Sequence, residues 1–334
     1  MPPKANCAGI EVMPTPQAVT WPDTCNPALT NTTPWIALDR RNACDHVAFL
    51  ITVVDVNTGE ETGRSVMHAA NKMLASTTAP NWSVPVDVTV RSSTTPVGRP
   101  TGSTATFVPC ATDCAASSVS YAAVNASYWR GSATLSATPM ASNTWREHVF
   151  GQWHVTFSNP QWITTTSVDL YTADSRCDNA YGGSAANCVF PNVPATMSFS
   201  LAVNAEFNNH VQRALLSGLP GMAGSTTYLH KVFSPSVARK NGDTACPQSL
   251  PRPAQKQCDE YPFRSTYEGA YTSGDPTPRS FPGCEMDDPE RTGPSGFSRC
   301  FINETQNGSA GAYLVNFYRA QRMLANDPFQ IEFV

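Results

Sequence analysis

Residues 256 to 270 read Lys-Gln-Cys-Asp-Glu-Tyr-Pro-Phe-Arg-Ser-Thr-Tyr-Glu-Gly-Ala, in a chain of which only 14% of the residues are charged. Three carboxylates gather here, those of Asp259, Glu260 and Glu268. They can be solvated loop charges, but the apolar residues 261–263 and the neighbouring Cys258 favour a fixed segment. Because a fixed cluster of acids is costly unless a cation lies among them, the stretch predicts a site for a hard divalent metal ion.

The composition is that of a loop-rich globular protein. The chain has 334 residues, 41% of them hydrophobic, with 28 prolines and 20 glycines, and its length suits two domains. Its longest apolar run, 47–54, is too short to span a membrane, and the opening Met-Pro-Pro-Lys lacks the apolar core of a signal peptide. We therefore expect no membrane association and no obligate protein partner.

Eleven cysteines indicate an oxidising compartment. The cysteines do not form the Cys-x-x-Cys pairs with histidines that are typical of zinc sites. The extracellular space is thus the expected location, with any signal peptide absent from this chain. Neighbours in sequence suggest five groups, with Cys44 left over, although proximity alone does not fix the pairing: Cys7/Cys25, Cys110/Cys114, Cys177/Cys188, Cys246/Cys258 and Cys284/Cys300.

The first two hundred residues predict an all-β, sandwich-like accessory domain over residues 1–199. This part is rich in Thr, Ser, Ala and Val, and Pro and Gly separate its short apolar runs. The runs that predict strands are 47–56, 86–90, 104–108, 149–157, 167–171 and 196–203. We interpret the tryptophans Trp129, Trp153 and Trp162 as core residues, with a carbohydrate-binding surface as the alternative.

Residues 200–334 predict an α+β domain. Residues 206–217 carry apolar side chains at helical spacing, and Gly218 follows where a helix would end. A second helix is expected over about 310–324, and residues 329–334 alternate as a terminal strand. The numbers of positive and negative side chains in this region are nearly equal, so its net charge does not by itself indicate a nucleic-acid partner.

Three blocks of this region, in order, resemble the NucA/NucB-type secreted deoxyribonucleases. The central block is the Cys-Asp-Glu-Tyr-Pro-Phe-Arg-Ser-Thr-Tyr-Glu-Gly segment at 258–269. Before it, Asn-His-Val-Gln-Arg-Ala at 209–214 resembles the opening helix of the family. After it, Asn-Gly-Ser-Ala-Gly-Ala-Tyr-Leu at 307–314 resembles the segment leading into the closing helix. The resemblance spans residues 204–334 and nothing before.

The resemblance implies a ββα-metal nuclease, in which a β-hairpin and a following helix hold one divalent ion, Mg²⁺ or Mn²⁺, with Ca²⁺ as a further possibility. Asp259 is then the general base, with Glu260, Glu268 and Asn307 as catalytic or metal-binding residues. Which of Asp259 and Glu260 is the base stays open. Where the family carries an acid before the asparagine, this chain has Gln306, with Glu304 two residues earlier, and both are candidate ligands.

Three basic residues are candidates for binding the substrate. Arg239 and Lys240 match a basic position of the family, with plain surface charges as the alternative, and Arg264 stands where a small alanine is usual. We interpret His210 as a structural histidine. The family thus implies a secreted, metal-dependent endonuclease acting on DNA with little sequence preference. The alternative is a noncatalytic secreted binding protein with a degenerate nuclease-like domain.

Overall fold

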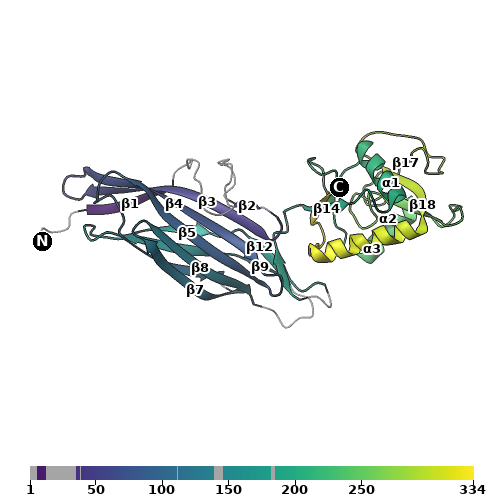
Figure 1. The fold of residues 1–334 in the computed structure, drawn as a ribbon. Helices are drawn as coiled ribbons and strands as arrows, with labels where there is room; N and C mark the ends of the chain where they lie inside the picture. The colour runs from purple at the N-terminus through teal and green to yellow at the C-terminus, as the bar shows by residue number, and fades with distance from the viewer. Residues whose placement is uncertain (1–5, 13–34, 38, 111, 139–145, 182–184) are drawn as a thin grey trace. The chain divides into compact units, whose positions relative to one another are not determined.

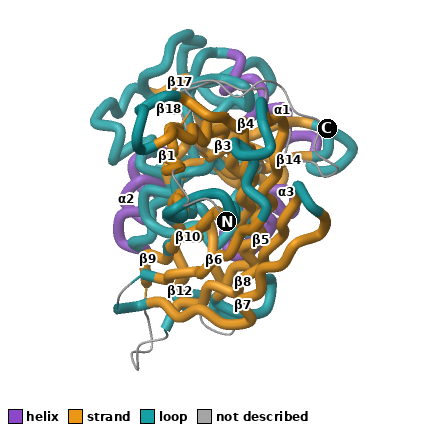
Figure 2. The backbone as a smooth tube through the Cα atoms, turned by 90° about the vertical axis from the view of Figure 1, so that its left-hand side faces the viewer, coloured by secondary structure: helices purple, strands orange, loops and turns teal. Residues whose placement is uncertain are grey.

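The computed structural model describes residues 6–12, 35–37, 39–110, 112–138, 146–181 and 185–334 (Figure 1). The chain divides into two compact units, Met1–Phe190 and Pro191–Val334. Every helix of the described residues lies in the second unit, and the three helices are drawn purple in Figure 2. Within the described residues the first unit is thus built from strands, and the second combines strands with helices.

The N-terminal unit is built from antiparallel strands. One sheet has the order β1-β3-β4-β5-β8-β7, with β2 also paired to β3, and two smaller sheets have the orders β11-β10-β6 and β13-β12-β9. The strands are β1 (Asn6–Val12), β2 (Trp35–Ala37), β3 (Asn42–Asp55), β4 (Glu61–Ala75), β5 (Asn81–Ser93), β6 (Gly102–Pro109), β7 (Cys114–Asn125), β8 (Tyr128–Ala137), β9 (Arg146–Val149), β10 (Gly151–Ser158), β11 (Thr166–Tyr171), β12 (Ser175–Asp178) and β13 (Asn187–Val189).

The large sheet curls over the β11-β10-β6 sheet and encloses an apolar core. Phe157 on β10 packs against Phe49 of β3 and Trp129 of β8, with ring centroids 5.6 and 6.4 Å apart. Trp129, Trp153 and Trp162 are all buried, so the interpretation of these tryptophans as core residues is confirmed. A carbohydrate-binding surface made of them is excluded, because their rings are not open to a ligand.

The sequence analysis did not predict three long strands of this unit. No strand was expected at β4, β7 or β8. β4 contains Ala, Asn and Lys, which have weak strand propensity, and β7 is mostly exposed and rich in Ala and Ser. Their pairing with neighbouring strands decides their conformation, because strand stability comes from cross-strand contacts more than from intrinsic preference.

Four of the five predicted cysteine groups form disulfides. The pairs are Cys110–Cys114, Cys177–Cys188, Cys246–Cys258 and Cys284–Cys300. The Cys7/Cys25 group is wrong, because Cys7 is the free cysteine of the described residues and Cys44, the expected odd one, is disulfide-bonded. Cys25 itself lies outside the described residues. Spacing along the chain does not fix which cysteines pair.

The C-terminal unit combines two small sheets with three helices around a separate core. The sheets have the orders β14-β19-β15 and β16-β18-β17. Phe207, Tyr261, Phe317 and Phe329 are among the buried side chains between them. The elements are β14 (Ala195–Phe199), α1 (Ala205–Leu216), β15 (Leu229–His230), α2 (Pro235–Ala245), β16 (Lys256–Tyr261), β17 (Pro278–Arg279), β18 (Phe297–Asn303), α3 (Glu304–Ala320) and β19 (Pro328–Phe333).

Residues 191–199 group with the C-terminal unit, whereas the sequence placed the domain boundary between 199 and 200. The cause is β14, which pairs in parallel with β19 along its whole length, from Ala195 opposite Phe329 to Phe199 opposite Phe333. The run predicted as a strand over 196–203 accordingly ends at Phe199. The terminal strand and the 206–217 helix are confirmed by β19 and α1. In the described residues, no helix has both the length and the apolarity needed to cross a membrane.

Candidate active site

The acidic stretch folds into β16, which pairs antiparallel with β18 so that Asp259 lies opposite Cys300. β18 runs directly into α3, whose first turn is capped by the side chain of Asn303, which accepts the N–H groups of Thr305 and Gln306. The two strands are not a simple hairpin, because residues 262–296 form a long connection between them. Along the chain, β16 is followed by the short β17, then by β18 and α3.

Helix α3 begins at Glu304 rather than near Ala310, which is a correction to the sequence prediction. The cap at Asn303 starts the helix before Gly308 and Gly311. Both glycines have open space where a Cβ would lie, so they tolerate the helix without being required for contact. As a result Asn307 lies in the first turns of α3 instead of in a loop, and its Nδ2 donates to Gln257 Oε1 of β16 at 3.0 Å.

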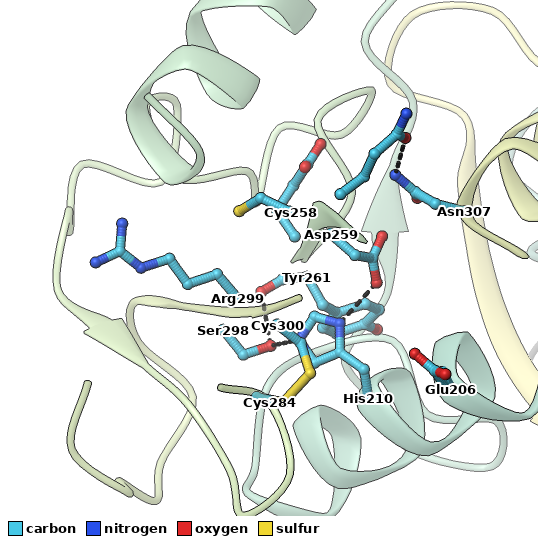
Figure 3. Close-up of polar contacts among 12 residues, drawn as sticks. Glu206, His210, Cys258, Asp259, Tyr261, Cys284, Ser298, Arg299, Cys300 and Asn307 are labelled. Atoms are coloured by element: carbon cyan, nitrogen blue, oxygen red, sulfur yellow. Dashed lines mark hydrogen bonds and ion pairs between the residues drawn. A yellow bond between two sulfur atoms is a disulfide. The ribbon is translucent and has the colours of Figure 1, made fainter. Parts of the chain in front are cut away.

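Asp259 is held by a buried histidine from α1 (Figure 3). Its Oδ2 lies 2.6 Å from Nδ1 of His210, and because a carboxylate oxygen accepts, this nitrogen carries the proton. The other ring nitrogen, Nε2, lies 2.9 Å from the hydroxyl oxygen of Ser298 on β18. His210 is only 1% exposed and both of its nitrogens are engaged, so it positions Asp259 and does not reach the solvent.

A cavity of about 230 Å³ lies beside this pair, at the edge of the sheet where β16 has no further strand neighbour. Its polar lining comes from Asp259, Glu260, Arg264 and Asn307, and the α1 residue Phe207 and α3 residue Leu314 add apolar walls. The second carboxylate oxygen of Asp259 is turned away from His210 (Figure 3). The cavity thus brings together the Asp-Glu pair of the central block and the asparagine of the last block.

Glu260 lies on the α2 side of β16. One carboxylate oxygen is 3.8 Å from Nε of Arg264, and the other is 3.8 Å from the sulfur of Cys246. Burial, and next the negative charge of Asp259, raise the pKa of Glu260 to about 8. The burial of Glu260 next to Asp259 is electrostatically costly, and Arg264 offsets this cost only in part.

The cavity offers oxygen donors of the kind that a hard cation requires. They are the carboxylates of Asp259 and Glu260 and the amide oxygen of Asn307, whose nitrogen is already occupied by Gln257. Among the described residues no group of three His, Cys, Asp or Glu side chains is close enough to hold a metal ion by itself. A metal ion here would therefore take part of its coordination from water and from substrate phosphate, as Mg²⁺ commonly does.

The other predicted metal ligands lie outside the cavity lining. Glu268 binds His230, accepting its backbone N–H and lying 2.8 Å from its Nδ1. Gln306 accepts the backbone N–H of Glu206, one of the unpaired donors at the start of α1. Glu304 opens α3 and is exposed. Each of these side chains is placed where a structural contact or open solvent accounts for it.

Of the predicted substrate-binding residues, one lines the cavity and two do not. Arg264 lines the cavity, and 54% of its side chain is exposed. Arg239 and Lys240 are exposed on α2, a helix that the sequence analysis did not predict, and do not line the cavity. Lys240 lies over the ring of Tyr271, with its Nζ 5.1 Å from the ring centroid.

The sequence analysis assigned no role to Gln257 or Ser298 and did not foresee the contact between His210 and Asp259. A signal for His210 was present, since it sits in the middle of the first block and on the apolar face of its helix. Gln257 could have been suspected from strand alternation, because residues 257 and 259 face the same side of β16. Ser298 gave no signal of its own.

Residues 236–332 match the model of the deoxyribonuclease NucA/NucB family. The match confirms the resemblance of the C-terminal unit to this family and supports deoxyribonuclease activity, for which DNA is the implied substrate. It covers β16, β18, α3 and all but the last residue of β19, and it does not include α1 with His210 or any part of the N-terminal unit. No match was found among curated proteins or solved structures.

Proposed function

We propose that this protein is a secreted, divalent-metal-dependent endodeoxyribonuclease that cleaves DNA with little regard to its sequence. The observation that carries the proposal is the cavity at the edge of β16, where Asp259, Glu260 and Asn307 come together within the matched segment. The four disulfides between described cysteines support an extracellular location. The nearly balanced charge of the unit favours local contacts with the phosphate backbone over a broad basic groove.

Asp259 is suited to act as the general base. His210 fixes Oδ2, so the free oxygen is the one that can take a proton from a water molecule attacking the phosphorus atom. The buried Ser298 holds the far side of the imidazole, which prevents the ring from turning. As water attacks, the phosphodiester bond to the leaving oxygen breaks and negative charge grows on the phosphoryl oxygens.

Glu260 and Asn307 are the residues that would hold the metal ion together with the phosphate. A bound divalent cation supplies charge neutralisation for the phosphoryl oxygens and the leaving oxygen. Arg264, at the same cavity, places a guanidinium where it can pair with a phosphate oxygen. Glu268, Gln306 and Glu304, which the family resemblance also implied, are left as structural residues in this proposal.

A noncatalytic binding protein is the second candidate, and Gln306 is the observation that favours it. The family usually has an acid at this place, whereas here the amide serves α1 through its bond to Glu206. A chain that had exchanged a metal ligand for a structural contact would keep the fold and lose the chemistry.

A plasmid-nicking assay separates the two functions. The full chain is incubated with supercoiled plasmid in Mg²⁺, in Mn²⁺ and in EDTA, next to Asp259→Asn and the control Glu268→Gln. Metal-dependent conversion to nicked and linear DNA by the wild type and the control, but not by Asp259→Asn, supports the nuclease. Nicking that persists in EDTA, or equal activity of Asp259→Asn, overturns the assigned mechanism, and an inactive wild type supports the binding protein.

A further inference from the structure

Tyr271 is an aromatic residue left open to solvent in a segment that is otherwise tightly held. It is 52% exposed, whereas Ala270 before it is buried. The backbone N–H of Tyr271 donates to Oδ1 of Asn241 at 3.0 Å. An exposed aromatic ring on a fixed backbone offers a rigid apolar face on which a planar ligand can stack.

Asn241 links this ring to the cavity. It is fully buried on α2, and its side chain bonds the backbone of two stretches of the same loop. Its Nδ2 donates to the carbonyl oxygens of Arg264 and Thr266 at 2.8 and 2.9 Å, while its Oδ1 accepts from Tyr271. Arg264, which lines the cavity, and Tyr271 are therefore fixed to one side chain and keep a constant spacing.

A positive charge accompanies the ring. Lys240 of α2 places its Nζ over Tyr271, 5.1 Å from the ring centroid, and Arg239 is its exposed neighbour. Asp243, one turn later, offsets part of this charge. From Arg264 through α2 to Lys240 the surface thus presents cations for phosphates and one half-exposed ring with Lys240 over one of its faces, and cations beside an accessible ring are the combination that binds unpaired nucleic acid strands.

We propose that Tyr271 stacks on a base of an unpaired DNA strand, with Lys240 holding a neighbouring phosphate, so that the site selects single-stranded or frayed DNA over an intact duplex. The inference rests on the proposed function for its substrate class. A base in a duplex has both faces covered by its neighbours, whereas an unpaired base can leave the stack and cover Tyr271.

Binding measured without metal tests this inference apart from cleavage. Fluorescence anisotropy in EDTA compares a labelled 12-nucleotide single strand with the duplex of the same sequence on the full chain. We expect Tyr271→Ala to bind the single strand about tenfold more weakly and the duplex unchanged, in line with the usual cost of losing one stacked base. Tyr271→Phe should bind like the wild type, since the stacking face remains.

Two controls complete the experiment. Tyr171→Ala removes a similarly exposed tyrosine from the N-terminal unit and should change nothing. A strand carrying several abasic positions should bind the wild type and Tyr271→Ala equally. Single-strand binding by Tyr271→Ala within about twofold of the wild type, an equal loss for strand and duplex, or no single-strand binding by the wild type overturns the inference. The expected pattern in a protein that cleaves no DNA keeps this inference and removes the proposed nuclease.

Discussion

Each unit of the chain contains a buried, hydrogen-bonded pair of side chains that includes histidine. The two pairs differ in whether one of their members lines a cavity. In the N-terminal unit Nε2 of His46 lies 3.0 Å from Nδ1 of His68, and both residues are buried. In the C-terminal unit His210 binds Asp259, which also lines a cavity. Burial and hydrogen bonding are thus common to both, and only the second pair brings a carboxylate to a cavity where chemistry can occur.

Burial shapes the electrostatics at both pairs. Burial lowers the pKa of His46 and of His68 to about 4, which keeps both rings neutral and makes them ordinary core residues at neutral pH. The carboxylate beside His210 has a second carboxylate, Glu260, as its chain neighbour, and the pKa of Glu260 is raised to about 8. At neutral pH a pKa of about 8 keeps Glu260 mostly protonated, so the neutral form prevails at Glu260 as it does at the two histidines, until a cation or a base draws the proton away.

Removing the charge of Asp259 gives the largest expected effect. Asp259→Asn keeps the shape and a hydrogen bond to His210 but loses the base, so we expect the initial rate of DNA cleavage to fall on the order of 10²-fold or more. His46→Gln, in the N-terminal pair, should leave the rate unchanged. A rate for Asp259→Asn within about threefold of wild type would show that the pair with Asp259 matters no more for cleavage than the N-terminal pair does.

Two disulfides of nearly equal loop length compare the units directly. Cys246–Cys258 spans 12 residues next to Asp259, and Cys177–Cys188 spans 11 in the N-terminal unit. Replacing either pair by serine should cost its own unit roughly 3 kcal/mol of stability, through the greater freedom of the unfolded chain. Only the Cys246→Ser/Cys258→Ser variant should also slow cleavage, by severalfold, because β16 loses its tie to α2.

Denaturant unfolding followed by hydrogen exchange locates the loss in each unit, and initial rates at a temperature where both variants stay folded give the effect on cleavage. Equal rates for the two double variants would show that the covalent link near Asp259 does not position it.

The N-terminal pair predicts sensitivity to acid. Each histidine has a folded-state pKa of about 4, below its ordinary 6.5, so its contribution to stability is present above pH 6.5 and is lost as the pH falls toward 4. Asp45, whose pKa burial raises to about 7, acts in the opposite sense and loses stability as the pH rises through the same window.

The difference between wild type and His46→Gln/His68→Gln isolates the histidines. We expect the melting temperature of the N-terminal unit, measured by calorimetry, to fall more steeply in the wild type than in the variant between pH 6.5 and 4. Parallel curves would mean that the pair is already charged or that it titrates alike in the folded and unfolded chain.

Gln306 gives the smallest expected effect. Gln306→Ala removes one hydrogen bond at the start of α1 and should lower the stability of the C-terminal unit by about 1 kcal/mol, with cleavage unchanged. Urea unfolding and the plasmid assay measure the two quantities. A large loss of activity at unchanged stability would indicate that Gln306 is a metal ligand. It would also contradict the second candidate function, that of a noncatalytic binding protein.

The residues that line the candidate cavity were easier to name from the sequence than the fold that holds them. Asp259, Glu260 and Asn307 could be named because carboxylates and amides with fixed spacing are a local signal. The partner of Asp259 could not, since His210 reaches it only when α1 packs on β16, a contact across 49 residues. Glu268 carried the same local signal as Glu260, and only the path of the chain shows that it turns to His230 instead.

Contacts between residues far apart in sequence also explain the errors in the N-terminal unit, because no local pattern reveals them. Strand β4 carries no strong pattern and is fixed by β3 and β5 on either side. The free Cys7 lies on an edge strand whose partner is β3, and no spacing between cysteines reveals that pairing. Periodicity predicted the elements whose own side chains bury one face, such as α1 and β19, because their pattern is local.

The parallel pairing of β14 with β19 sets an order of events during synthesis. Ser198 lies opposite Glu332, which follows 134 residues later, so the first strand of this unit waits for almost all of the rest to leave the ribosome. Contacts of such long range form late in folding. In a nascent chain β14 therefore has no strand partner until β19 has been synthesised.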